Sequence, residues 1–154
     1  MNYSEVISIF KGQLSLLGKR LRDKDGKTLF KDVTTSSLED SYLHEQIDEG
    51  FMKFVSLCPN LVDGVSFDST GITYTFKNTR DSHAIDTALK HYLSSHILYE
   101  YVSVAYPNLS QKAANDVTYR LNTLLGVALH KDSYDSNTDF GSVKGEVILE
   151  GGRD

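Results

Sequence analysis

The sequence contains few of the residues that hold small proteins together by special means. Among its 154 residues there are one cysteine, two prolines and no tryptophan. The single cysteine, Cys58, excludes an internal disulfide framework and fits a reducing compartment. No apolar run approaches the roughly 20 residues of a membrane-spanning helix, and residues 2–5 are not typical of a signal peptide. We therefore expect a soluble protein with no membrane partner.

The composition is that of an ordinary folded domain. Hydrophobic residues make up 40% and charged residues 24% of the chain, which excludes a disordered or collagen-like protein. A chain of this length buries about 70% of its unfolded surface, so folding requires neither a metal nor a disulfide. The net charge of −5 argues against a general nucleic-acid coat. We predict one helical domain over residues 1–131, followed by a polar loop and a C-terminal strand or tail over residues 132–154.

Four segments have apolar residues at helical spacing. They cover residues 4–20, 37–58, 82–106 and 108–131. Ser4 is the predicted N-cap of the first segment, and Ser36 with Glu39 forms a capping-box pattern before the second. Each segment is therefore expected to pack one apolar stripe into a shared core.

The two prolines predict where helices end. Pro59 stops the second helix at or before Cys58, and Pro107 stops the third. Asn108 with Gln111 resembles a capping box that opens the fourth helix. Because so few residues separate the third and fourth helices, we expect them to pack as an antiparallel helical hairpin.

Between the second and third helices the hydrophobic period changes from helical to alternating. The alternating apolar residues are Val65, Phe67, Ile72, Tyr74 and Phe76. The connection between the two halves, residues 68–71, contains Asp, Ser, Thr and Gly. This pattern predicts a β-hairpin at about residues 61–77. The fold class is therefore mainly α, a four-helix bundle-like domain with an inserted β-hairpin and an extended C-terminal strand or tail.

The third helix carries aromatic residues most of the way round. Its apolar stripe runs from Ile85 to Val104, and its tyrosines are Tyr92, Tyr99, Tyr101 and Tyr106. A helix with this pattern is covered on most sides, so some of these rings should contact another element or another subunit. A late alternating run, residues 143–150, has no evident local partner; its apolar residues Val143, Val147 and Leu149 are further interface candidates.

No catalytic or metal-binding motif stands out. His44 and Asp48 lie four apart, but a zincin needs a second histidine there, and we expect a solvated helix face. Cys58 is expected to be a buried, inert thiol. We therefore predict no enzyme activity, no catalytic residue, no metal and no cofactor.

The chain near its C-terminus resembles part of a calcium-binding loop. Asp135, Asn137 and Asp139 match the first ligand positions of an EF-hand, and Glu146 falls at the twelfth. Phe140, however, occupies the position where the sharp turn requires glycine. The preferred interpretation is an acidic loop. The alternative, a site that binds a cation weakly, stays open.

Charge is unevenly distributed along the chain. Residues 1–34 have seven basic and four acidic side chains, a net charge of +3, whereas residues 132–154 have two basic and six acidic ones, a net charge of −4. These ends could attract each other between neighbouring copies. The alternative, which we favour, is that both are solvated surface.

The order of elements resembles a known family. A short N-terminal helix, a helix ending at Cys58-Pro59, a hairpin and two long helices separated by Tyr106-Pro107-Asn108-Leu109 precede an acidic tail. Over residues 35–131 this architecture is similar to that of the small helical head-to-tail connector (adaptor or neck) proteins of tailed bacteriophages.

The resemblance implies a structural virion protein, assembled in the bacterial host cytoplasm. It would form a homo-oligomeric ring between portal and tail, with copies of itself and the portal, tail or neighbouring neck proteins as partners. Phe67, Ile72 and Tyr74 of the hairpin, together with the late strand, would be projecting parts. The net charge of −5 suggests an acidic lumen through which DNA passes without specific binding.

Two other functions remain open. One is a small non-viral helical module that binds or regulates a single partner, which predicts a monomer or dimer. The other is a small enzyme using His91, His96 and Glu100, which requires a concave site that unites distant polar residues.

Overall fold

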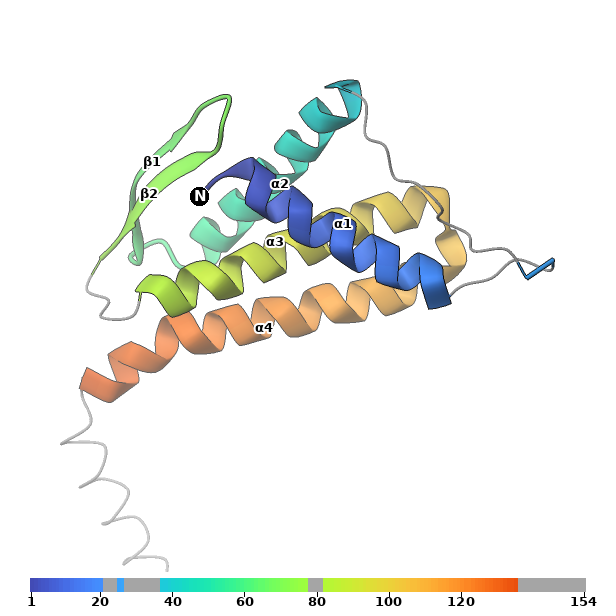
Figure 1. Cartoon of the computed structure of the whole chain (residues 1–154). Helices are drawn as coiled ribbons and strands as arrows, with labels where there is room; N and C mark the ends of the chain where they lie inside the picture. Colours follow the sequence, from blue (N-terminus) through green and yellow to red (C-terminus); the bar gives the residue numbers. More distant parts are fainter. Residues whose placement is uncertain (21–24, 27–36, 78–81, 136–154) are drawn as a thin grey trace, which may run out of the picture.

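The computed structural model describes residues 1–20, 25–26, 37–77 and 82–135 (Figure 1). Its elements are α1 (Tyr3–Arg20), α2 (Ser37–Leu57), β1 (Val62–Phe67), β2 (Ile72–Phe76), α3 (Ser82–Ala105), the 3-10 turn η1 (Pro107–Leu109) and α4 (Ser110–Asp135). The predicted mainly helical fold with an inserted hairpin is confirmed. The predicted strand over residues 143–150 lies outside the described residues.

Helix α3 is the centre of the molecule. All residues from Tyr92 to Ile97 are buried, and α1, α2 and α4 pack around this helix (Figure 1). Six consecutive residues span more than one full turn, because a turn takes 3.6 residues. The helix is therefore enclosed on every side at this level, as the aromatic and apolar pattern predicts.

Three contacts define the directions of the helices around α3. Glu5 lies beside Lys90, and the ring of Phe10 meets the edge of Tyr101, so α1 and α3 run in the same direction. The Ser95 hydroxyl donates a hydrogen bond to Asp116 at 2.8 Å, with α4 returning along α3. The predicted antiparallel pairing of the third and fourth helices is confirmed.

The hairpin turn is organised by one carboxylate. Oδ1 of Asp68 accepts hydrogen bonds from the backbone N–H of Thr70 at 2.6 Å and from that of Gly71 at 3.0 Å. These bonds and one from the Thr70 hydroxyl hold the pKa of Asp68 below its usual range. An aspartate that bonds the backbone two residues on is typical of tight turns, which explains why the sequence pattern located the turn.

Strand β1 contains a bulge. Val62 pairs with Phe76 and Asp63 with Thr75, but the register shifts before Ser66 pairs with Thr73. Gly64, inside the shifted segment, has φ of 59°, a left-handed conformation that glycine adopts without steric cost.

The first residues of the chain extend the hairpin. The Ile72 N–H donates to the carbonyl of Met1 at 2.9 Å, and the Tyr3 N–H donates to the carbonyl of Thr70 at 3.0 Å. Asn2 and Gly71 form an isolated antiparallel bridge between these bonds. The N-terminus is therefore fixed to β2 before the chain enters α1.

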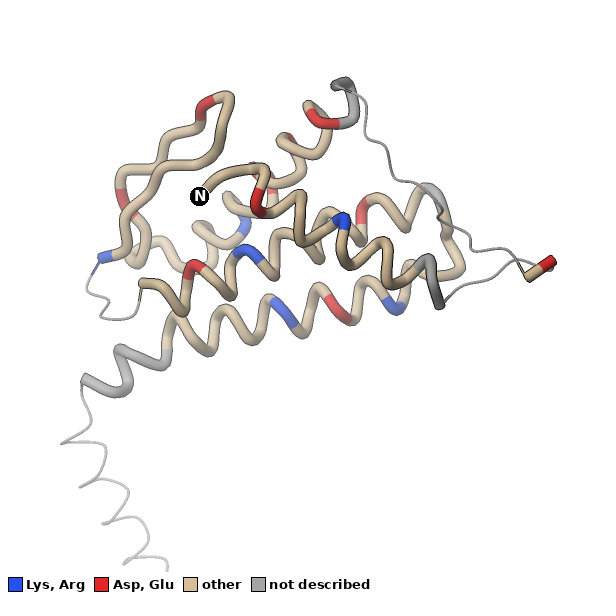
Figure 2. The backbone as a smooth tube through the Cα atoms, viewed as in Figure 1, with Lys and Arg blue, Asp and Glu red and all other residues tan. Residues whose placement is uncertain are grey.

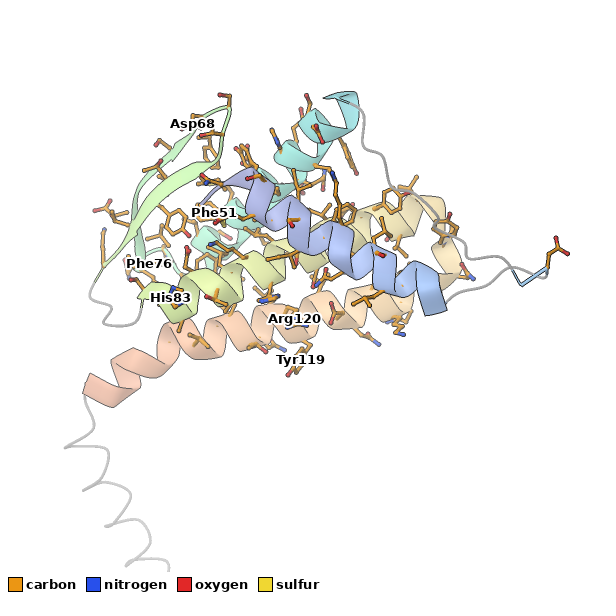
Figure 3. The ribbon with its side chains drawn as sticks, viewed as in Figure 1. Phe51, Asp68, Phe76, His83, Tyr119 and Arg120 are labelled. Atoms are coloured by element: carbon orange, nitrogen blue, oxygen red, sulfur yellow. The ribbon has the colours of Figure 1, made fainter. Side chains whose placement is uncertain are left out.

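The hairpin lies against the helical body more closely than the predicted projection implies. Ile72 is buried in the core, and the ring of Tyr74 lies 5.0 Å from that of Phe51, which faces the hairpin from α2 (Figure 3). Of the three candidate hairpin residues, Phe67 has the most open side chain, 42% exposed.

The predicted helix boundaries are wrong at three places. Helix α1 starts at Tyr3, so Ser4 lies within its first turn and is not the N-cap. Helix α4 starts at Ser110 after η1, and Gln111 donates to Asn115 at 3.1 Å instead of closing a box with Asn108. The same helix continues to Asp135, beyond the predicted end at residue 131.

Gly71 provides a test of the N-terminal contact. A Cβ at this position would lie 2.1 Å from the Met1 carbonyl oxygen, a backbone atom. We expect Gly71→Ala to lower the free energy of unfolding by about 1–3 kcal/mol, measured by urea denaturation, because the N-terminal segment must move away from β2.

Gly126→Ala is the matched control. Gly126 lies inside α4, and a Cβ there would meet nothing within 4 Å. This variant should be more stable than the wild type by about 0.5–1 kcal/mol, since alanine favours the helix. Equal effects of the two substitutions would contradict the proposed role of Gly71.

Candidate functional site

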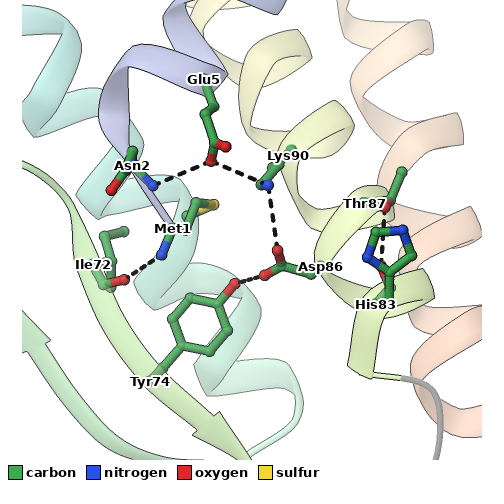
Figure 4. Close-up of polar contacts among 9 residues, drawn as sticks. All are labelled: Met1, Asn2, Glu5, Ile72, Tyr74, His83, Asp86, Thr87 and Lys90. Carbon is green, nitrogen blue, oxygen red and sulfur yellow. Dashed lines mark hydrogen bonds and ion pairs between the residues drawn. The ribbon is translucent and has the colours of Figure 1, made fainter.

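The most connected polar cluster lies where α1, β2 and α3 meet (Figure 4). Lys90 contacts Glu5 at 3.1 Å and Asp86 at 3.4 Å. The hydroxyl of Tyr74 donates a hydrogen bond to Asp86, and the amino group of Met1 donates to the Ile72 carbonyl at 2.8 Å. The cluster therefore joins three elements that are distant in sequence.

The pKa values in this cluster reflect its pairing. Burial and the hydrogen bond to Asp86 raise the pKa of Tyr74. Hydrogen bonding to Lys90 lowers the pKa of Glu5. Partial burial alone would lower the pKa of Lys90, but its contacts with Glu5 and Asp86 raise it overall. The shifts at Tyr74, Glu5 and Lys90 favour the protonation states in which these three residues make their contacts.

A cavity of about 630 Å³ adjoins the cluster. Its lining residues are Met1, Thr73, Tyr74, Thr75, Phe76, Ser82, His83 and Asp86. Ser82 and His83 are exposed at the start of α3, while the Asp86 carboxylate already accepts from Tyr74 and contacts Lys90. Through this carboxylate the hairpin is joined to α3.

A second cavity, of about 700 Å³, lies between α1, α2 and the hairpin turn. Its lining includes Tyr3, Lys11, His44 and Thr70. The rings of Tyr3 and His44 stack with centroids 4.2 Å apart, and the Tyr3 hydroxyl donates to Asp48 at 2.7 Å. Burial raises the pKa of both Tyr3 and Asp48. Tyr3 therefore covers part of the face that we expected to be solvated, and His44 and Asp48 are half-buried.

A third polar group lies inside the core. His96 packs against Gly50 of α2, where an added Cβ would lie 2.9 Å from the imidazole ring. Neither Nε2 of His96 nor the hydroxyl of Tyr92 has a hydrogen-bond partner among the described residues. Burial lowers the pKa of His96, Lys53 lowers it further, and Glu100 and Glu49 act in the opposite direction. His96, one of the three residues of the enzyme alternative, is therefore shielded from solvent.

The predicted interface tyrosines have different surroundings. Tyr92 is completely buried within the chain, so a contact with another subunit in this conformation does not include it. Tyr99, Tyr101 and Tyr106 are half-buried, with Tyr101 packed against Phe10 of α1. The other interface candidates, Val143, Val147 and Leu149, lie outside the described residues.

The structure exposes apolar residues that sequence reasoning missed. Val104, predicted to continue the apolar stripe of the third helix, is 81% exposed, and Leu16 of α1 is 58% exposed. Leu57 of α2 and Leu129 of α4 are 50% and 52% exposed. Helical spacing identifies apolar faces but not where a neighbouring helix stops covering them, so no signal in the spacing separates Val104 from the buried Val102.

Acidic and basic residues follow one another along α1, α3 and α4, whereas α2 carries several acidic residues before Lys53 (Figure 2). The predicted difference in net charge between the two ends of the chain depends mostly on residues 19–31 and 132–154. The side chains of these residues are largely outside the described set. Lys77 and Asp63 pair at 3.6 Å on the hairpin, and Arg120 lies 3.8 Å from Asp116 on α4.

Three further expectations concern metals, the thiol and membranes. Within the described ranges, no cluster of three or more His, Cys, Asp or Glu side chains has a metal-binding arrangement. Asn137 and Asp139 of the EF-hand-like loop lie outside those ranges. Cys58 is buried, and burial raises the pKa of its thiol. Across the described part of the chain, every helix is too short or too polar to cross a membrane.

No family model, curated protein or solved structure matches this chain. The fold and its surfaces are therefore the basis of the functional argument.

The buried imidazole predicts acid sensitivity. Because the pKa of His96 is lower in the folded state than the ordinary value of 6.5, the unfolded chain binds more protons below that pH. The stability that neutral His96 contributes is present above pH 6.5 and is lost as the pH falls toward the folded-state pKa. We expect His96→Leu to weaken the decrease in unfolding free energy between pH 7 and 5, measured by urea denaturation at each pH.

His83→Leu is the control for this measurement, because His83 is exposed at the start of α3. It should retain the wild-type pH dependence. The same acid sensitivity in the His96 variant as in the wild type would show that His96 is not its source.

The bond between Tyr74 and Asp86 predicts a stability effect. Tyr74→Phe removes the hydroxyl donor and leaves a half-buried carboxylate with one partner fewer, so we expect a loss of about 1–2 kcal/mol in unfolding free energy, measured by urea denaturation.

Tyr119→Phe is the control, because Tyr119 is exposed and points away from the bundle (Figure 3). This variant should change the unfolding free energy by less than about 0.5 kcal/mol. In an Asp86→Ala background, which has no side-chain acceptor for the hydroxyl, the effect of Tyr74→Phe should shrink; an undiminished loss would mean that the bond does not cause it.

Proposed function

We propose that this protein is a structural subunit that assembles into a homo-oligomeric ring, of the kind that joins portal and tail in the neck of tailed bacteriophages. In this role it is a virion component and has no catalytic activity. Its partners are copies of itself and the adjoining portal, tail or neck proteins, and DNA passes through the ring without specific binding.

The observation that carries the proposal is the exposure of apolar residues at opposite ends of the bundle. Leu16 and Val104 lie toward the C-terminal ends of the parallel helices α1 and α3. Leu57 and Leu129 line one groove at the other end. Two different surfaces on opposite sides of one subunit support head-to-tail contacts, which generate a closed ring when the rotation between subunits closes.

The polar groups of the described residues support a structural role as well. The carboxylates of Asp86 and Asp48 are engaged by tyrosine hydroxyls, and the imidazole of His96 is buried. The two tyrosine–carboxylate bonds join separate elements, as expected for a subunit whose role is structural.

The solution mass of the purified full-length protein tests the proposal. We expect light scattering over a range of concentrations to give a single multi-subunit mass, and electron microscopy to show ring-shaped particles. A mass of one or two subunits at every concentration would contradict the ring and favour the alternative of a small module that binds a single partner.

A further inference from the structure

Strand β2 has an edge that can accept a further strand. The Ile72 N–H donates to the Met1 carbonyl at 2.9 Å, on the side of β2 that faces away from β1. Because backbone groups along a strand point alternately to its two edges, those of Tyr74 and Phe76 face the same side as those of Ile72. Within the part of the chain that the structure describes, these two residues have no backbone partner on that side.

This edge of β2 is regular, whereas β1 is interrupted. Lys77, five residues after Ile72, donates its N–H to the Leu61 carbonyl at 2.8 Å on the β1 side, as strict alternation requires. In β1 the register shifts around Gly64, and a bulge of this kind breaks the row of backbone groups that a new strand needs. The open edge of β2 is therefore the better acceptor.

The N-terminal residues already occupy the first part of this edge. The Met1 amino group donates to the Ile72 carbonyl at 2.8 Å (Figure 4), and residues 1–3 run antiparallel to β2. Beyond Met1 the edge borders the cavity of about 630 Å³, whose lining includes residues 73–76 of β2 together with Ser82 and His83 of α3. The space beside Tyr74 and Phe76 is therefore open among the described residues.

The two faces of β2 define the sequence pattern that an added strand needs. Ile72 is buried and Tyr74 and Phe76 are half-buried, whereas Thr73 and Thr75 are exposed. Residues directly opposite each other in an antiparallel pair lie on the same face of the sheet. An added strand therefore needs apolar side chains at every second position on the inner face and polar side chains between them.

Residues 143–150 have this pattern. Val143, Val147 and Leu149 lie at alternate positions, with Gly145 as the fourth member of the same face. The intervening residues are Lys144, Glu146, Ile148 and Glu150. Three of these four side chains are charged, so this face is suited to solvent and the other to the half-buried side of β2.

Helix α4 delivers this segment to the correct end of β2. Leu129 of α4 lines the same groove as Lys77, which directly follows β2, and the ends of β2 and α4 lie at one end of the molecule (Figure 1). The helix ends at Asp135, about 9 Å after Leu129. Residues 136–142 can span up to about 23–25 Å, which is enough to return from the end of α4 to Phe76.

We propose that residues 143–150 add to the open edge of β2 in their own chain, as an antiparallel strand whose C-terminal end points toward Met1. A segment that enters at Phe76 and runs toward Ile72 is antiparallel to β2, like residues 1–3. The contact lies within one molecule, so it does not depend on the ring proposed above.

Two proline variants of the full-length protein test this contact. Glu146→Pro/Val147→Pro removes two consecutive N–H donors, and one of any two consecutive residues in an added strand has to point toward β2. Gly151→Pro/Gly152→Pro is the matched control, because it places two prolines beyond the alternating run. Backbone hydrogen exchange is measured by mass spectrometry with fragmentation to single residues.

We expect the Tyr74 and Phe76 amides to exchange about tenfold faster in Glu146→Pro/Val147→Pro than in the wild type or the control, because they lose their carbonyl acceptors. The Ile72 amide, which donates to Met1, should exchange at the same rate in all three chains. Equal rates at Tyr74 and Phe76 in the three chains would overturn the proposal. An increase of the same size at Ile72 would also overturn it, because the effect would not be specific to the open part of the edge.

Cross-linking separates the chain's own segment from that of a neighbouring copy. All chains carry Cys58→Ala, or Cys58→Val if the alanine variant loses helicity by circular dichroism. One chain adds Thr75→Cys and Glu146→Cys, which both lie on the solvent face of the proposed sheet. The control chain adds Tyr119→Cys, at an exposed position of α4, with Glu146→Cys. Each is treated with a short bis-maleimide, and the products are separated on a denaturing gel.

We expect several-fold more internal cross-link in the chain with Thr75→Cys than in the control chain. A yield equal to the control would overturn the proposal. A mixture of two chains, one with Thr75→Cys alone and one with Glu146→Cys alone, should give no cross-linked dimer. Strong dimer formation in this mixture, without the internal cross-link, would overturn the proposal in favour of the segment of a neighbouring copy.

Discussion

Enclosure of α3 on every side is the constraint on which the rest of the structure depends. A helix that is buried around its whole circumference needs neighbours in at least three directions, and α1, α2 and α4 supply them. Because Ser94, Ser95 and His96 lie in the enclosed stretch, their polar atoms have to be accommodated inside the protein. The Ser94 hydroxyl donates to the carbonyl of His91 in its own helix, and the Ser95 hydroxyl donates to Asp116. The Nε2 atom of His96 has no hydrogen-bond partner within the part of the chain that the structure describes.

The hairpin and the N-terminus complete this enclosure at the beginning of α3. Tyr74 connects β2 to Asp86, and Lys90 on the next turn of α3 connects to Glu5 of α1. The same strand receives the first residues of the chain as a short additional partner. The hairpin is therefore part of the body at Ile72 and open to solvent at Phe67.

Periodicity in the sequence was enough to predict the helices, the hairpin and most of the core. Val6, Phe10 and Leu14 repeat at helical spacing and are all buried, and Asp68 lies where the alternating pattern breaks into a turn. Partners across long distances were not predictable in this way. Nothing local in Asn2 or Tyr3 indicates that they meet Thr70, Gly71 and Asp48, because those contacts depend on how whole helices cross. The same limit explains the wrong predictions of Tyr92 as an interface residue and of Val104 as part of the buried stripe.

The anchoring of the N-terminus to β2 has a consequence for the order of folding. Contacts between α3 and α4 close only a short loop, whereas the Met1–Ile72 and Glu5–Lys90 contacts close loops of more than 70 residues. The entropy cost of closing a loop rises with its length, so the α3–α4 hairpin is favoured as an early structure and α1 as a late one. During synthesis α1 leaves the ribosome before α3, so it cannot form its contacts with α3 until that later helix has been made.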